Sequence, residues 1–149
     1  ARACSKDFGL IVADRKQTLE LTLPDNAPSP VLGDPALLRR VLDNLVHNAV
    51  EHTPAGGRIL INVVAEGATG VRVEVSDSGP GVPLEAREQL FHKFFQRGMK
   101  RHVGNVGLGL ALCEKVVTRH GGSIGIGDAV PHGARFYFTL PVVPVPKAV

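Results

Sequence analysis

The sequence has no tryptophan, one tyrosine, one methionine and two cysteines among its 149 residues. It also lacks an apolar run near the ~18 residues of a membrane-spanning helix, and no signal-like segment opens the chain. Cys4 and Cys113 lie far apart, outside any metal-binding or redox spacing. We interpret them as free thiols in a reducing compartment, which favours a cytoplasmic location.

Strong charge of either sign is also lacking. Seventeen basic and 14 acidic residues leave a formal charge of +3, and the pI is about 9.1. Nucleic-acid binding requires a basic stripe with interleaved aromatics, whereas the one dense basic segment is confined to residues 93–102. We therefore expect no nucleic-acid partner. The 44% hydrophobic content instead indicates a globular protein with a core.

The apolar pattern predicts alternating strands and helices. In chain order the expected elements are a short helix within 1–16, a strand at 17–24, a helix at 34–53, strands at 58–65 and 71–77, a short helix at 84–91, a helix at 107–122, and strands at 123–129 and 135–141. Strands joined by tight turns are antiparallel. The order predicts an α/β sandwich, with a mixed, mostly antiparallel sheet covered on one face by helices. We expect one domain, 1–149, ending in a loose Pro-rich tail at 142–149.

The helix at 34–53 carries two asparagines, Asn44 and Asn48, one turn apart in its interior. Asn is a poor residue there, because its amide competes for backbone hydrogen bonds. Residues four apart share one helix face, so both side chains can point at the same group. The alternative is that both amides merely bond a neighbouring loop.

Two Gly-rich stretches follow predicted strands or precede a predicted helix. Asp77 ends a strand and is followed by Gly79 and Gly81. Two glycines let the backbone approach a flat ligand, and the carboxylate can accept from an exocyclic amine such as that of adenine. The alternative is a tight turn with a solvated Asp. GNVGLGLA at 104–111 opens a helix, where free N–H groups favour anions, yet it fits neither the Walker A nor the Rossmann pattern.

Four motifs stand in order: the Asn helix, DSGPG at 77–81, LFHKFF at 90–95 and GNVGLGL at 104–110. Together they resemble the ATP-binding catalytic domain of sensor histidine kinases, within the Bergerat-fold (GHKL) ATPases. The resemblance covers about residues 17–141. It implies the Bergerat fold, ATP and Mg²⁺ as cofactors, and transfer of the γ-phosphoryl group to a His on a separate dimerisation domain, with a response regulator downstream.

Carried over by position, the resemblance assigns Asn48 as the Mg²⁺ ligand, with Asn44 beside it as a second catalytic residue. An amide carbonyl is a hard oxygen ligand of the kind Mg²⁺ takes. Asp77 would bind the adenine amine, with Gly79 and Gly81 along the base. The other residues that the resemblance places at the nucleotide are Glu51, His52, Phe91, Lys93, Phe94, Arg97, Val106, Gly107, Leu108, Gly109 and Leu110.

Asn44 also bears on the reaction. ATP-hydrolysing relatives have a water-activating Glu at this position, and an amide cannot take up a proton. This favours phosphoryl transfer to a protein over hydrolysis. None of the six histidines is followed by an acidic residue, so we expect the phosphoacceptor His to lie upstream of Ala1, and the present chain to be monomeric.

Glu51 departs from the family pattern, which usually has Lys or Arg there. A carboxylate would repel the triphosphate unless it helps to hold the metal. The resemblance implies that the polar, basic loop at 92–106 is a lid over the ATP, anchored by Phe91 and Phe94. We hypothesise that basic residues of this lid, among them Lys93 and Arg97, replace the missing charge; the alternative is a solvated basic face.

Two other functions stay open on the sequence. One is a non-catalytic nucleotide-binding or interaction module of the same fold. The other is an ATP hydrolase of the gyrase type, which Asn44 and the lack of a transducer domain disfavour. Contact with a membrane would come only through segments outside this chain.

Overall fold

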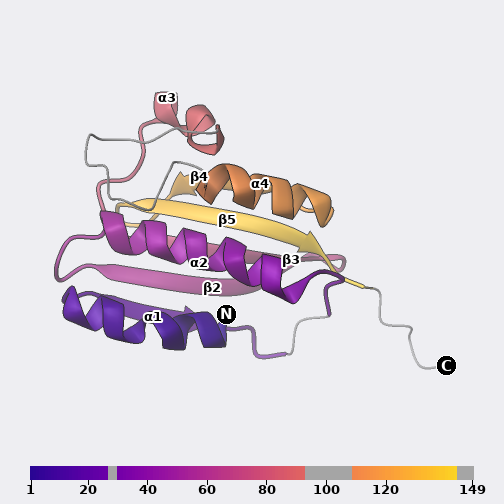
Figure 1. The fold of residues 1–149 in the computed structure, drawn as a ribbon, viewed down its shortest axis with the longest axis horizontal. Coiled ribbons are helices and arrows are strands. Elements are labelled where there is room, and N and C mark those ends of the chain that lie inside the picture. The colour runs from indigo at the N-terminus through magenta and orange to yellow at the C-terminus, as the bar shows by residue number, and fades with distance from the viewer. Residues whose placement is uncertain (27–29, 93–108, 144–149) are drawn as a thin grey trace.

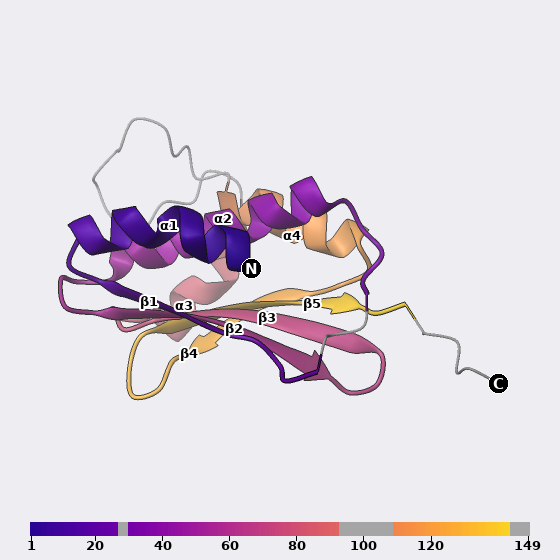
Figure 2. The same cartoon turned by 90° about the horizontal axis from the view of Figure 1, so that it is seen from below.

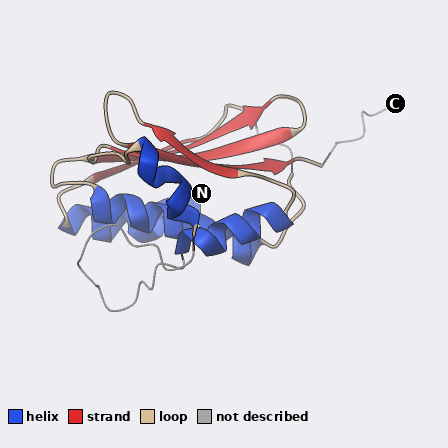
Figure 3. Ribbon diagram, turned by 90° about the horizontal axis from the view of Figure 1, so that it is seen from above, coloured by secondary structure: helices blue, strands red, loops and turns tan. Residues whose placement is uncertain are grey.

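The computed structural model describes residues 1–26, 30–92 and 109–143, and it packs helices against one face of a five-stranded sheet. The elements are α1 (Arg2–Asp14), β1 (Thr18–Thr22), α2 (Pro35–His52), β2 (Arg58–Glu66), β3 (Gly70–Asp77), α3 (Leu84–Arg87), the 3-10 turn η1 (Glu88–Phe91), α4 (Gly109–Arg119), β4 (Ile124–Asp128) and β5 (Ala134–Pro141). Figure 2 shows α1, α2 and α4 in one layer and the strands in the other, and Figure 3 shows the same helical and strand layers by colour. The predicted α/β sandwich is confirmed.

The sheet has the strand order β1-β2-β3-β5-β4. β1 runs parallel to β2, and the remaining neighbours are antiparallel, as expected for a mixed sheet. Asp77 pairs with Ile59 at the start of β2, and Ser76 pairs with Arg135 at the start of β5. The register therefore brings the end of β3 to the edge where the α2–β2 connection and the β4–β5 turn also lie.

Helix α2 crosses the middle of the sheet between α1 and α4 (Figure 1). It begins as the sequence predicts, because the Asp34 carboxylate accepts from the N–H groups of Ala36 and Leu37, and Pro35 follows it. Its apolar face packs into the core from Val41 onward, and the buried residues are Val41, Leu42, Leu45, Val46, Ala49 and Val50. Burial of this face against the sheet fixes the direction of the two asparagines at its margin.

The predicted loose tail is wrong for its first two residues. Val142 donates its N–H to the carbonyl of Thr69 at 2.9 Å, and Val143 donates to Pro30 at 2.8 Å. Val142 also forms a bridge with Val31, so the ordered chain continues two residues beyond the C-terminal end of β5. Residues 144–149 lie outside the described part of the chain.

The two buried thiols make the stability of the folded protein depend on pH in the alkaline range. Cys4 and Cys113 are both fully buried and free, and burial raises the pKa of each to about 12 from 9.0. Unfolded thiols lose their protons first, so the folded state holds more protons between these values. The thiol contribution to stability is complete below about pH 9 and is lost as pH rises towards 12. Urea denaturation of the wild type should show this fall, and the Cys4→Ala/Cys113→Ala variant should show a shallower one; equal slopes would contradict it.

Candidate functional site

Asp77 lies at the end of β3 and is only 5% exposed. Its Oδ1 accepts the N–H of Gly79 at 2.8 Å and the N–H of Ala134 at 3.2 Å. These are the two side-chain hydrogen bonds that Asp77 makes to the described residues, and the same oxygen accepts both. The carboxylate is held rigidly, and the β5 strand contributes to holding it.

The two glycines of the loop at 77–81 have different structural reasons. A Cβ on Gly79 would lie 2.5 Å from the carbonyl oxygen of His52, so only glycine allows this loop to rest on the last turn of α2. Gly81 has φ +74, a left-handed conformation that favours glycine. The loop therefore joins the end of β3 to the helix that carries Asn44 and Asn48.

Gly133 packs against Asp77, although the sequence placed this glycine only in a turn between two predicted strands. Its φ is +113, and a Cβ there would lie 1.8 Å from the carbonyl oxygen of Asp77 and 3.1 Å from Asp77 Oδ1. The residue after it, Ala134, supplies one of the two N–H groups that hold the carboxylate. The only sequence signal was a glycine directly before a strand, and register alone shows that it meets Asp77.

Gly133→Ala is expected to lower the free energy of unfolding by about 2 kcal/mol, because a methyl group must displace the backbone of Asp77 in a strained conformation. Thermal or urea unfolding measures this loss. Gly67→Ala is the control, since Gly67 also has a positive φ but nothing lies within 4 Å of its Cβ position. Equal losses in the two variants would mean that backbone conformation, and not contact with Asp77, requires the glycine.

The polar side chains in the second half of α2 have different surroundings. Asn44 is half-buried and lies beside the Cys113 thiol on α4. Asn48 is half-buried, and no hydrogen bond engages its amide within the described residues. The backbone carbonyl of Asn48 lies 2.8 Å from His52 Nδ1, which fits an Nδ1–H donor. Glu51 is exposed, with Oε1 3.9 Å from Nδ1 of His47.

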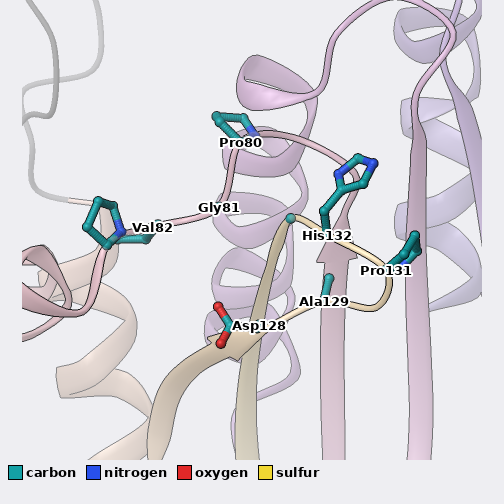
Figure 4. A pocket seen from close by; sticks show the side chains of 9 residues that line it. Pro80, Gly81, Val82, Asp128, Ala129, Pro131 and His132 are labelled. Carbon is teal, nitrogen blue, oxygen red and sulfur yellow. The ribbon is translucent and has the colours of Figure 1, made fainter.

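A pocket of about 410 Å³ opens between the loop that follows β3 and the β4–β5 turn (Figure 4). Its lining residues are Pro80, Gly81, Val82, Pro83, Asp128, Ala129, Pro131, His132 and Gly133. Asp128 is ion-paired with Arg87 at its rim, and His132 Nδ1 is 3.3 Å from the carbonyl of Gly79. No residue of α2 lines this pocket, so neither Asn44 nor Asn48 belongs to it.

The last predicted site segments are only partly described. Phe91, in η1, and Leu110, in α4, are half-buried and pack against the core, while Gly109 begins α4. Lys93, Phe94, Arg97, Val106, Gly107 and Leu108 lie outside the described residues. Within the described ranges no three His, Cys, Asp or Glu side chains cluster as a metal cage would require, and no helix there is long and apolar enough to cross a membrane.

The mixed sheet, the Asn helix on its covered face and the carboxylate held at the end of β3 define a histidine-kinase type of ATPase domain. Residues 33–144 match the family described as histidine kinase-, DNA gyrase B- and HSP90-like ATPase, and the chain belongs to this family. It is 35% identical over 136 residues to the adaptive-response sensory kinase SasA of Rippkaea orientalis, covering 91% of this chain and 34% of that protein. The chain thus spans about a third of the length of such relatives.

Solved structures give the same classification. The catalytic domain of histidine kinase ThkA superposes with a TM-score of 0.81 at 33% identity, covering 96% of this chain and 92% of that one. ThkA in complex with response regulator protein TrrA matches with a TM-score of 0.78 at 31% identity over 98% of this chain and 40% of that chain. Full-length ShkA in complex with AMPPNP matches at 0.81 and 28%, covering 97% and 30%. The resemblance to sensor histidine kinase catalytic domains is confirmed.

Proposed function

We propose that residues 1–149 form one catalytic domain that binds Mg²⁺-ATP and transfers its γ-phosphoryl group to a His on a separate dimerisation domain of the same kinase. A response regulator would then receive the phosphoryl group. The rigidly held Asp77 carboxylate carries this proposal, because a fixed acceptor with one oxygen unused by the described protein suits an adenine amine. The ThkA–TrrA and ShkA–AMPPNP complexes support the partner and the nucleotide by similarity.

The residues present fit a magnesium ion. Asn48 offers an amide oxygen at a half-buried position, with no competing partner for its amide among the described residues. Mg²⁺ is commonly held by one or two protein oxygens together with substrate phosphates and waters, so a cage of carboxylates is unnecessary. When bound there, the ion would neutralise charge on the phosphates. The N–H groups at the start of α4, whose described part begins at Gly109, would face the same phosphates.

The chemistry of α2 favours transfer over hydrolysis. In transfer, an imidazole nitrogen of the acceptor His forms a bond to the γ-phosphorus while the bond to the bridging oxygen breaks and ADP leaves. Hydrolysis would require a group at Asn44 that removes a proton from water, and an amide cannot do this. The neighbouring Cys113 thiol cannot substitute, because burial raises its pKa to about 12 and keeps it protonated.

The test mixes the chain and γ-labelled ATP with a separately produced fragment of the proposed dimerisation domain, a helical hairpin that carries the acceptor His. Acid-labile phosphate on the hairpin is the expected result. Binding of ATP without any transfer would support a second function, a non-catalytic nucleotide-binding module, and failure to bind ATP would overturn both. The second function is considered because Glu51 places an exposed carboxylate where the family usually has Lys or Arg.

Glu51→Lys is expected to tighten ATP binding about tenfold at low ionic strength, because it replaces a repulsive charge near the triphosphate by an attractive one. Isothermal titration measures the change, and added salt should reduce it. Glu66→Lys carries the same change in charge at the end of β2 distant from Asp77 and should leave the affinity unaltered. Unaltered affinity in Glu51→Lys would place Glu51 outside the site.

A further inference from the structure

Gln17 is a buried polar residue at the junction of α1 and β1, 6% exposed. Its side-chain Nε2 donates to the carbonyl of Val50 at 2.9 Å and to the carbonyl of Thr53 at 2.6 Å. Its Oε1 is buried and has no hydrogen-bond partner within the described residues. The structure therefore uses only the donor half of this amide, and uses it on the end of α2.

The end of α2 needs such donors. The last carbonyls of a helix have no partner within the helix, and α2 ends at Thr53 in an extended conformation and not in a glycine cap. Thr53 donates both its N–H and its hydroxyl to the carbonyl of Ala49, at 3.0 and 2.6 Å. Gln17 satisfies the carbonyls of Val50 and Thr53, and Arg15 Nη1 makes a longer contact of 3.4 Å to the carbonyl of Val50, so side chains from outside the helix hold its last turn.

The backbone conformation next to Gln17 directs this residue towards the end of α2. Lys16 has φ +55, a left-handed conformation that residues other than glycine rarely adopt. The carbonyl of Lys16 accepts from Gly56 at 2.7 Å, and Thr18 donates to Gly57 at 3.0 Å. Backbone hydrogen bonds on both sides of Gln17 thus join the α1–β1 connection to the α2–β2 connection.

The end of α2, which Gln17 binds, contacts the proposed nucleotide site. Glu51 and His52 lie between the two carbonyls that Gln17 binds. Gly79 packs closely against the carbonyl of His52, and it donates its N–H to Asp77. A shift in the last turn of α2 would therefore move both the helix that carries Asn48 and the loop that holds Asp77.

We propose that Gln17 is a positioning residue of the nucleotide site, acting through its two hydrogen bonds to the end of α2. The inference rests on the proposed function and adds a residue that touches no part of the predicted ligand. It requires the donors of residue 17 and not its acceptor, because only Nε2 is engaged.

Three substitutions separate these requirements. Gln17→Glu keeps the shape but removes the N–H groups, and Gln17→Met removes all polarity at similar length; each is expected to weaken Mg²⁺-ATP binding about tenfold. Gln17→Lys supplies donors without an acceptor, and a cation is favourable at a helix C-terminus, so it should recover most of the affinity. Titration is done at a temperature where every variant is fully folded.

Val71→Ala is the matched control for simple destabilisation. Val71 is buried in β3 six residues before Asp77, about 20 Å along the strand. It should lower the melting temperature but leave the affinity unaltered. Wild-type affinity in Gln17→Glu and Gln17→Met, or an equal loss in Val71→Ala, would overturn the inference alone. Absence of ATP binding by the wild type would overturn the proposed function as well.

Discussion

Asp77→Asn is expected to weaken ATP binding about 100-fold while the fold is kept. The Asn Oδ1 can still accept from Gly79 and Ala134, which are the two bonds that hold this side chain. The second oxygen, however, is replaced by an NH₂ group, which presents donors to the donor amine of adenine. Loss of a hydrogen bond to a charged group costs about 1.5–3 kcal/mol, and each 1.4 kcal/mol is about a factor of ten. Isothermal titration with ATP measures the change.

Inosine triphosphate provides the matched ligand, since a carbonyl replaces the amine. The wild-type carboxylate should reject it, whereas the amide of Asp77→Asn can donate to that carbonyl. The variant should therefore bind the inosine nucleotide better than ATP, reversing the wild-type preference. Equal ATP affinity in wild type and Asp77→Asn, with no change of preference, would show that Asp77 does not contact the base.

Asn48→Ala is expected to reduce phosphoryl transfer to the His-bearing hairpin by roughly 1000-fold. Charge neutralisation by a metal contributes several kcal/mol to such reactions, and about 1.4 kcal/mol changes a rate tenfold. The affinity of the wild type for ATP should rise when Mg²⁺ is added, and that of Asn48→Ala should rise much less. Titrations with and without Mg²⁺ therefore separate the metal from the nucleotide.

Two further variants control this result. Asn48→Asp keeps an oxygen ligand and should retain most of the response to Mg²⁺. Asn62→Ala removes a half-buried asparagine of β2 whose amide is 3.4 Å from Glu74, and it should change neither transfer nor binding. A full Mg²⁺ response in Asn48→Ala would assign the metal to other residues.

Much of the fold followed from the sequence because the apolar spacing is local. The i, i+4 pattern of α2 and its Asp34–Pro35 start predicted that helix within one residue at each end. The Pro-rich tail misled prediction at Val142 and Val143, since their hydrogen bonds to Thr69 and Pro30 join segments far apart in the chain. Composition carries no information about such pairings.

The candidate site was predictable where its residues form short motifs. Asp77, Gly79 and Gly81 lie together in the chain, and the structure shows why the first glycine is needed against His52. Gly133 and Gln17 were not predictable, because their roles depend on strand register and on a side chain reaching another helix. Each acts on residues more than 30 positions away.

Chemical-shift mapping of the backbone amides, with Mg²⁺ and a non-hydrolysable ATP analogue, tests the proposed nucleotide site most directly. We expect the perturbed amides to cluster at the end of α2, in the loop at 77–81 and at the start of α4, with those near Asn48 changing only when Mg²⁺ is present. Perturbations confined to the uncovered face of the sheet, around Glu74 and Tyr137, or none at saturating nucleotide, would contradict the site.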